Sequence, residues 1–187
     1  MIKISIISPS VRKGRLSHRA ALYFRNYILE KNIGDVEILD LAQYNFPLFD
    51  ERLRLQESPT PAMIDFSDRI RLSDGVIIIT PEYNGGYPAS LKNAIDLLYS
   101  EWQKKPVAFV TVSDGNFGGT QSITALQFVF WKIGATSVPV SFRVPYVDKS
   151  FDGAGVPADK QTMDKRAEAF INELLWYIRA RKGAPEQ

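Results

Sequence analysis

Short runs of apolar residues alternate along the chain with longer segments in which apolar residues recur every three or four positions. The short runs, rich in Ile and Val, predict β-strands, and the longer segments predict helices with one apolar face. The predicted strands cover residues 3–7, 36–39, 76–80, 107–112 and 137–140. The predicted helices cover residues 17–31, 61–72, 88–98, 120–133 and 158–181.

Strand and helix thus follow one another five times, and the three central strands are apolar at nearly every position. Strands of that kind are covered on both faces, and the alternation is typical of a parallel sheet between two layers of helices. The sequence therefore predicts an α/β fold with helices on both faces of the sheet. The chain of 187 residues has the length of one domain, which we place at residues 1–182, followed by a short polar tail at 183–187.

The composition narrows the possible chemistry. The chain has no cysteine and one histidine, which excludes disulfides and thiolate nucleophiles and makes imidazole-rich metal sites and Ser-His-Asp triads poor candidates. A formal net charge of +2 is too balanced for binding driven by nucleic-acid phosphates. The strand pattern begins at residue 3 without a signal-peptide pattern, and no apolar run is long enough to span a membrane. We therefore expect a cytoplasmic protein with no membrane or nucleic-acid partner.

The segment 45–60, between the second strand and the second helix, contains Pro47, Pro59 and several charged residues. Its length suggests a surface excursion near the ligand edge of the sheet rather than a second domain. Phe46 and Phe49 either pack beneath this loop or line a pocket.

The loop after the first strand combines the hydroxyls of Ser8, Ser10 and Ser17 with the guanidinium groups of Arg12 and Arg15, just before a helix. Hydroxyls, a cation and the amides of a helix N-terminus suit a terminal phosphate. The alternative is that Ser17 caps the helix and the arginines are solvated. The loop lacks the GxxxxGK[ST] and GxGxxG patterns, which disfavours ATP hydrolysis and a standard dinucleotide site and favours a monophosphate bound without a metal.

The loop after the third strand carries the most specific motif, PEYNGGYPASLKNAID at residues 81–96. It resembles the flavin loop of the NADPH-dependent FMN reductase family, whose pattern is close to P-E-Y-N-x-x-x-P-x-x-L-K-N-A-I-D after an apolar strand. The matching residues are Pro81, Glu82, Tyr83, Asn84, Pro88, Leu91, Lys92, Asn93, Ala94, Ile95 and Asp96.

The resemblance covers nearly the whole chain. The loop SDGNFGGTQS at residues 113–122 is similar to the family's S-x-G-x-x-G-G turn, and LDLAQYNFPLFDE at residues 39–51 is similar to its D-L-x-x-x-P-L-[FY]-D segment. The first loop matches the family's S-x-R-x-x-S phosphate loop less closely. Ser10 and Arg12 match and the second serine is Ser17, but Pro9 replaces a frequent glycine and His18 stands where an asparagine is often found.

The resemblance implies a flavodoxin-like three-layer fold of strand order 2-1-3-4-5 with FMN at the edge of the sheet. The flavin carries the reactive chemistry, so neither a catalytic side chain nor a metal ligand is assigned. The residues expected to bind the cofactor are Ser10, Arg12, Ser17, His18, Pro81, Glu82, Tyr83, Asn84, Gly85, Ser113, Gly115, Gly118 and Gly119.

Within the third loop, we expect main-chain groups to lie along the flavin ring. Tyr83 would offer an aromatic wall, Glu82 would act through its backbone rather than its carboxylate, and Gly85 and Gly86 would permit a sharp turn. The alternatives are that the glycines form a plain turn and that Tyr83 belongs to the core. Arg15 could pair with the FMN phosphate or with the 2'-phosphate of NADPH.

The implied activity is hydride transfer from NADPH or NADH through bound FMN to a quinone, flavin, azo compound or similar small acceptor. The main alternative is a non-enzymatic FMN-binding electron-transfer protein of the flavodoxin type, although such carriers are commonly acidic. A further alternative is a flavin-binding protein whose ring site is covered by a partner.

The family resemblance also implies a homodimer or homotetramer, with the helix after the third-strand loop at the interface. In the segment LKNAIDLLYSEW, Leu98, Tyr99 and Trp102 are the candidate contacts, unless they pack inside the monomer.

Overall fold

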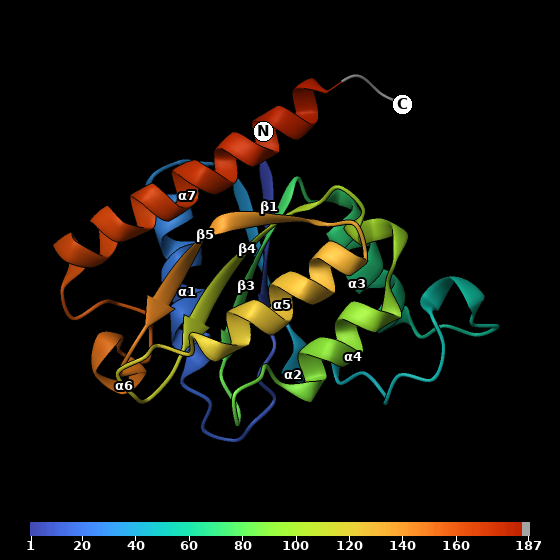
Figure 1. Ribbon diagram of the computed structural model, residues 1–187, viewed down its shortest axis with the longest axis horizontal. Helices are drawn as coiled ribbons and strands as arrows, with labels where there is room; N and C mark the ends of the chain where they lie inside the picture. Colours follow the sequence, from blue (N-terminus) through green and yellow to red (C-terminus); the bar gives the residue numbers. More distant parts are fainter. Residues whose placement is uncertain (185–187) are drawn as a thin grey trace.

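The computed structural model describes residues 1–184 and contains a five-stranded, fully parallel sheet of order β2-β1-β3-β4-β5 (Figure 1), which confirms the predicted flavodoxin-like fold class. The strands are β1 (Lys3–Ser8), β2 (Asp35–Asp40), β3 (Gly75–Pro81), β4 (Pro106–Val112) and β5 (Thr136–Val144). The helices are α1 (Ser17–Glu30), α2 (Leu41–Tyr44), α3 (Pro61–Leu72), α4 (Ala89–Leu97), α5 (Gln121–Lys132), α6 (Val147–Ser150) and α7 (Lys160–Gly183), with 3-10 turns at Leu53–Leu55 and Ser100–Trp102.

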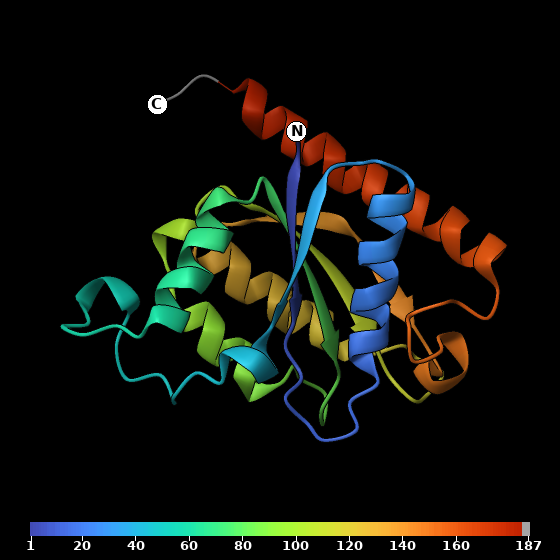
Figure 2. The same ribbon diagram turned by 180° about the vertical axis from the view of Figure 1, so that it is seen from behind.

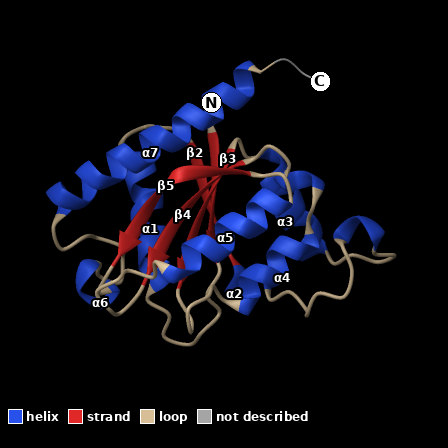
Figure 3. Cartoon of the chain, in the orientation of Figure 1, coloured by secondary structure: helices blue, strands red, loops and turns tan. Residues whose placement is uncertain are grey.

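The helices form two layers with the sheet between them (Figure 3). Helices α1 and α7 contribute to the apolar cluster on one face of the sheet, and α3, α4 and α5 contribute to the cluster on the other (Figures 1 and 2). Alternate residues of β3 divide between the two clusters: Ile77 and Ile79 belong to the first, and Val76 and Ile78 to the second. The apolar runs of the central strands are thus explained by burial on both faces.

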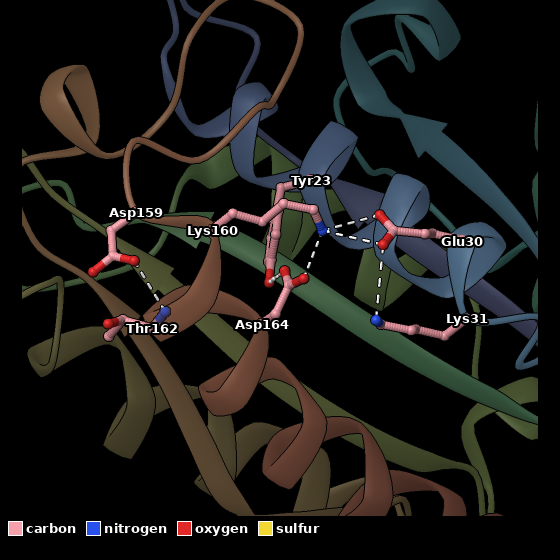
Figure 4. A network of polar contacts seen from close by, with 7 residues as sticks. All are labelled: Tyr23, Glu30, Lys31, Asp159, Lys160, Thr162 and Asp164. Atoms are coloured by element: carbon pink, nitrogen blue, oxygen red, sulfur yellow. Dashed lines mark hydrogen bonds and ion pairs between the residues drawn. The ribbon is translucent and has the colours of Figure 1, made fainter.

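The layer of α1 and α7 is joined by a polar network at the start of α7 (Figure 4). The Tyr23 hydroxyl donates a hydrogen bond to Asp164, 3.0 Å away, and the Lys160 ammonium bridges Glu30 and Asp164. Burial raises the pKa of Tyr23 far above its usual value, and its hydrogen bond to Asp164 adds to the effect, so the phenol stays protonated and can donate this bond. The network fixes where the last helix lies along the first.

Most predicted elements lie within two residues of those observed, but the last strand was predicted too short. It continues beyond residue 140 to Val144, with exposed residues at Pro139, Ser141 and Arg143. This strand forms an edge of the sheet, where a proline and polar side chains are tolerated, and these residues concealed the strand pattern. Helix α7 reaches Gly183, and residues 185–187 of the predicted tail lie outside the described residues.

The excursion at 45–60 is fastened to α4 through Asn93. The side-chain oxygen of Asn93 accepts a hydrogen bond from the Phe49 amide at 2.6 Å, and its nitrogen donates to the Pro47 carbonyl at 2.8 Å. Phe46 packs edge-on against Phe66, whereas the Phe49 side chain is 38% exposed. Phe46 therefore packs beneath the loop and also lines a cavity there, whereas Phe49 stays largely at the surface.

Of the candidate contacts on the α4 segment, Leu98 and Trp102 pack inside the monomer, as the alternative held, whereas Tyr99 is half-buried beneath the Arg52 guanidinium group and its role in an interface stays a prediction. Leu98 is 3% exposed and Trp102 is fully buried, with its indole nitrogen bonded to the Ile95 carbonyl. Both side chains belong to the core between α4 and the sheet, so they do not offer a surface to a partner. Among residues 1–184, none of the helices combines the length and the apolar character needed to cross a membrane.

Candidate functional site

The loops that follow β1, β3 and β4 meet at the carboxyl edge of the sheet, where the strand order reverses between β1 and β3. The loops after β1 and β3 lie side by side at the lower edge in Figure 2. They enclose a cavity of about 300 Å³ lined by Ser10, Arg12, Gly14, Arg15, Leu16, Ser17, Pro81, Glu82, Tyr83, Val112, Ser113, Asp114 and Val147. Seven of the predicted cofactor-binding residues share this cavity, whereas His18, Asn84, Gly85, Gly115, Gly118 and Gly119 do not line it.

The start of α1 is open to an anion. The N-cap position is occupied by Leu16, which has no side chain able to cap the helix, and Ser17 is the first helical residue. The Ser17 hydroxyl is buried and has no hydrogen-bond partner in residues 1–184. The helix-capping alternative for Ser17 is therefore wrong, and Ser17 lines a cavity together with the exposed Arg12. Buried polar groups normally have partners, and among the unpartnered buried hydroxyls of residues 1–184, those of Ser17, Thr111, Ser122 and Ser137, only that of Ser17 belongs to a residue lining this cavity.

Arg15 has a different role from Arg12. Its guanidinium group forms a two-pronged ion pair with Asp40 at the end of β2, and one nitrogen also donates to the Ser10 carbonyl at 2.6 Å. Burial alone would raise the pKa of Asp40, but the hydrogen bonds from Arg15 and the Ala42 amide outweigh burial and lower it below its usual value. The ionised pair thus fixes the first loop to the end of β2. The guanidinium group of Arg15 is already paired with Asp40, and its pairing with a phosphate of FMN or NADPH stays a prediction.

His18 is turned away from the cavity. Its Nδ1 atom lies 3.0 Å from the Ser8 hydroxyl and 3.9 Å from the Asp40 carboxylate. Burial lowers its pKa below the usual value, with Asp40 opposing this shift and Arg15 adding to it, so the imidazole is neutral at pH 7. Because one ring nitrogen faces both Ser8 and Asp40, the three do not form the relay of a catalytic triad.

The third loop contains a tight turn centred on Asn84 and Gly85. The Tyr83 amide donates to the Gly86 carbonyl at 2.7 Å, and the Gly86 amide donates back at 3.0 Å. Asn84 and Gly85 both have positive φ angles, +52° and +79°, which is the geometry that Asn-Gly favours in a two-residue turn. The turn therefore depends on Asn84 and Gly85, rather than on Gly85 and Gly86 as expected.

Tyr83 connects the first and third loops. Its hydroxyl lies 2.7 Å from the hydroxyl of Ser10, which belongs to the first loop. The side chain is half-buried and lines the cavity. It is therefore a wall of the site that also contacts the loop beside it, and the core alternative does not apply.

The two glycines of the fourth loop are required by the close approach of the chain to the sheet. Gly118 and Gly119 have φ angles of +64° and +78°, and a Cβ atom on Gly119 would lie 3.1 Å from backbone atoms of Val112. A Cβ atom on Gly115, in contrast, would meet no atom within 4 Å. The fold itself therefore explains Gly118 and Gly119, whereas the space above Gly115 is open.

Two contacts beside the cavity, made by Asp40 and Glu82, were not expected from the sequence. Asp40 forms the ion pair with Arg15. In the sequence it was noted only as part of the segment 39–51, which is similar to a segment of the family, and nothing there indicated an ion pair. The Glu82 carboxylate, expected to be idle, accepts a hydrogen bond from the Gln121 amide at 2.9 Å. No local pattern could indicate either contact, because the partners are 25 and 39 residues apart in the chain.

Other features of residues 1–184 do not rival this site. A cavity of about 410 Å³ lies at the opposite, amino end of β1 and β2, but its Arg69 is already paired with Glu37 and Asp65. Within the described part of the chain, no three acidic, His or Cys side chains gather in a way that could hold a metal ion.

Comparison with known proteins identifies the relatives of this chain. Residues 2–148 match the family described as NADPH-dependent FMN reductase. The NAD(P)H-dependent FMN reductase LOT6 of Saccharomyces cerevisiae is 34% identical over 141 residues, covering 68% of this chain and 73% of the relative. A quinone reductase of Pseudomonas putida is 33% identical over 151 residues, covering 77% and 76%.

The fold is also found among solved structures. FerB, a flavoenzyme NAD(P)H:(acceptor) oxidoreductase from Paracoccus denitrificans, superposes with a TM-score of 0.77 and covers 96% of this chain and 98% of its own. At 23% sequence identity, this likeness concerns the fold.

Proposed function

Because the chain belongs to the NADPH-dependent FMN reductase family and is an FMN-dependent NAD(P)H oxidoreductase, we propose that it reduces a quinone and holds FMN in the cavity between the first, third and fourth loops. The observation that carries the placement is the buried, unpartnered Ser17 hydroxyl at the uncapped start of α1. The quinone is favoured by the Pseudomonas putida relative, which is named for that activity.

The phosphate of FMN would occupy the end of the cavity nearest α1. There Ser17 offers a hydroxyl without a partner, Arg12 an unpaired cation, and the first turn of the helix its free amides. Ser10 can join them, since its hydroxyl already points to the Tyr83 hydroxyl on the cavity wall. This donor set suits a phosphate monoester without a metal ion.

The flavin ring would extend between the third and fourth loops. Pro81, Glu82 and Tyr83 line the cavity on one side and Ser113 and Asp114 on the other. The open space above Gly115 leaves room for a flat ring near the backbone.

Bound FMN supplies the chemistry, accepting a hydride from NAD(P)H and passing the electrons to the acceptor. The residues of the chain hold the cofactor and leave one side of the cavity open to the two substrates in turn. The relatives are named as reductases. Their names therefore do not favour the alternative that the protein is a non-enzymatic electron carrier of the flavodoxin type.

A single spectroscopic experiment tests this function. The purified protein, loaded with FMN and freed of unbound flavin, is expected to lose its yellow absorbance when NADPH or NADH is added without oxygen, and to regain it with a quinone. Colour that persists with both nucleotides would contradict the reductase activity. Colour that bleaches but is not restored by a quinone would contradict the acceptor proposed here.

We also propose that the protein forms a homodimer through the outer face of α5. Phe128 and Trp131 are 64% and 68% exposed, and their rings lie 5.9 Å apart. From Gln121 to Trp131 the helix carries no charged residue. Interface centres are depleted in charge and enriched in aromatic residues, and an uncharged face meets an identical face without repulsion.

The variant Trp131→Glu is expected to be a monomer, because two carboxylates would face each other across a two-fold axis. Light scattering at micromolar concentration gives the mass directly. Trp176→Glu is the matched control, since Trp176 on α7 is 61% exposed and lies on the other layer of the fold. A wild-type monomer, or a dimer that survives Trp131→Glu, would refute this interface.

A further inference from the structure

Glu82 contacts both ends of the fourth loop. Its amide donates a hydrogen bond to the carbonyl of Val112, the last residue of β4, at 3.2 Å. Its carboxylate accepts a hydrogen bond from the amide of Gln121, the first residue of α5, at 2.9 Å. The loop 113–120 therefore leaves the sheet and enters the helix at two points that are held by one residue of the third loop.

Helix α5 depends on this external contact because its own chain does not cap it. Thr120, at the cap position, has helical backbone angles of −60° and −31°, and its side chain makes no capping bond. The Thr120 hydroxyl donates instead to the Phe117 carbonyl at 2.6 Å. The Glu82 carboxylate thus takes the place of an N-cap from another part of the chain, and its negative charge suits the positive end of the helix dipole.

The two hydrogen bonds of Glu82 also affect the loop 113–120. The loop 113–120 contributes Ser113 and Asp114 to the lining of the cavity, and its Gly118 and Gly119 pack against the ends of β4 and β5. Gly118 and Gly119 place the end of the loop against the sheet. Their contacts do not determine how far the loop lies from the third loop. The two Glu82 bonds join the third loop to Val112 and Gln121, the residues on either side of the loop 113–120.

We propose that Glu82 is a positioning residue whose carboxylate holds the fourth loop at the distance from the third loop that the flavin ring requires. This inference rests on the proposed FMN site. Its consequence is that the carboxylate acts through Gln121 rather than by contacting the cofactor. The neutral amide of glutamine, which can accept the same hydrogen bond, should therefore replace it.

The first measurement is the dissociation constant of FMN, obtained from the quenching of flavin fluorescence. We expect Glu82→Ala to weaken binding by up to about tenfold, the limit reached when FMN must order the loop that the lost N-cap bond held in place. Glu82→Gln should stay within about twofold of wild type, because it keeps an acceptor for the Gln121 amide. Glu168→Ala, which removes an exposed carboxylate from α7, controls for loss of charge.

The second measurement is hydrogen exchange at the Gln121 amide by NMR in the protein without FMN. Exchange should be faster in Glu82→Ala than in wild type and close to wild type in Glu82→Gln. The two measurements separate the proposed FMN site from the role of Glu82. Absence of FMN binding by wild type would contradict the site, whereas exchange of the Gln121 amide tests the contact with Glu82 without any ligand. Equal FMN affinity in wild type and Glu82→Ala would overturn the inference, as would equal weakening in the Ala and Gln variants.

Discussion

The variant Asp40→Ala is expected to unfold at a lower temperature and to bind FMN weakly. The Asp40 carboxylate is 4% exposed and its partner Arg15 is 19% exposed, so removing Asp40 leaves a largely buried guanidinium group unpaired. Breaking a buried ion pair from one side lowers the free energy of unfolding by about 3–5 kcal/mol. At about 2–4 °C per kcal/mol for a chain of this size, the corresponding drop in Tm is roughly 6–20 °C. Differential scanning calorimetry measures it.

In Asp40→Ala, FMN affinity would fall because the first loop changes position, and not because Asp40 itself contacts FMN. Arg15 also holds the Ser10 carbonyl, so without Asp40 the first loop is no longer fastened to β2. Asp40→Asn provides the matched comparison, because its amide oxygen can still accept bonds from Arg15 and the Ala42 amide. We expect Asp40→Asn to be destabilised less than Asp40→Ala. Wild-type stability in Asp40→Ala would show that the pair does not anchor the loop.

The variant Arg12→Ala should differ from Asp40→Ala in stability, with an unchanged Tm, and should show a large loss of FMN affinity. Arg12 is exposed, lines the cavity, and its side chain has no partner within residues 1–184, so its removal breaks no internal contact. A charge-assisted hydrogen bond to a phosphate contributes about 1.5–3 kcal/mol. Losing it should therefore raise the dissociation constant of FMN about 10- to 150-fold. Fluorescence titration with FMN gives this constant.

Lys13→Ala is the control for Arg12→Ala, since Lys13 is the next residue, is exposed and does not line the cavity. Its FMN affinity should stay close to wild type. If the two variants lose affinity equally, the contribution of Arg12 is a general effect of positive charge rather than contact with the phosphate. If neither loses affinity, the phosphate does not bind at this end of the cavity.

The sequence predicted the layers of the fold because each layer has its own period. The unbroken apolar run at Val76–Ile79 predicted a strand buried on both faces. The segments between such runs have apolar residues every three or four positions, which predicted helices. The last strand was the exception: at an edge of the sheet, Pro139 and Arg143 are tolerated, so the apolar signal was lost. The position of Trp102 was left open for a related reason, because an aromatic residue after a helix has the same pattern whether it faces solvent or core, and the structure places it in the core.

The site was predicted to the level of loops but not of side-chain partners. Motif spacing indicated that Ser10, Ser17 and Tyr83 would share one edge, and the structure places them around one cavity. Their binding of FMN stays a prediction. The contacts of Asp40 with Arg15 and of Glu82 with Gln121 could not be predicted, because each depends on how separate strands bring distant residues together.

The hydrogen bond between the hydroxyls of Ser10 and Tyr83 has a thermodynamic consequence for ligand choice. A serine hydroxyl has one proton, so when Ser10 donates it to a phosphate, Tyr83 must become the donor within the pair. Hydrogen bonds arranged in such a chain strengthen one another. Occupancy of the phosphate end and order at the ring end would then be linked, and linkage of this kind is reciprocal. Riboflavin, which has the ring without the phosphate, would lose this cooperative part of the binding energy as well as the phosphate contacts themselves.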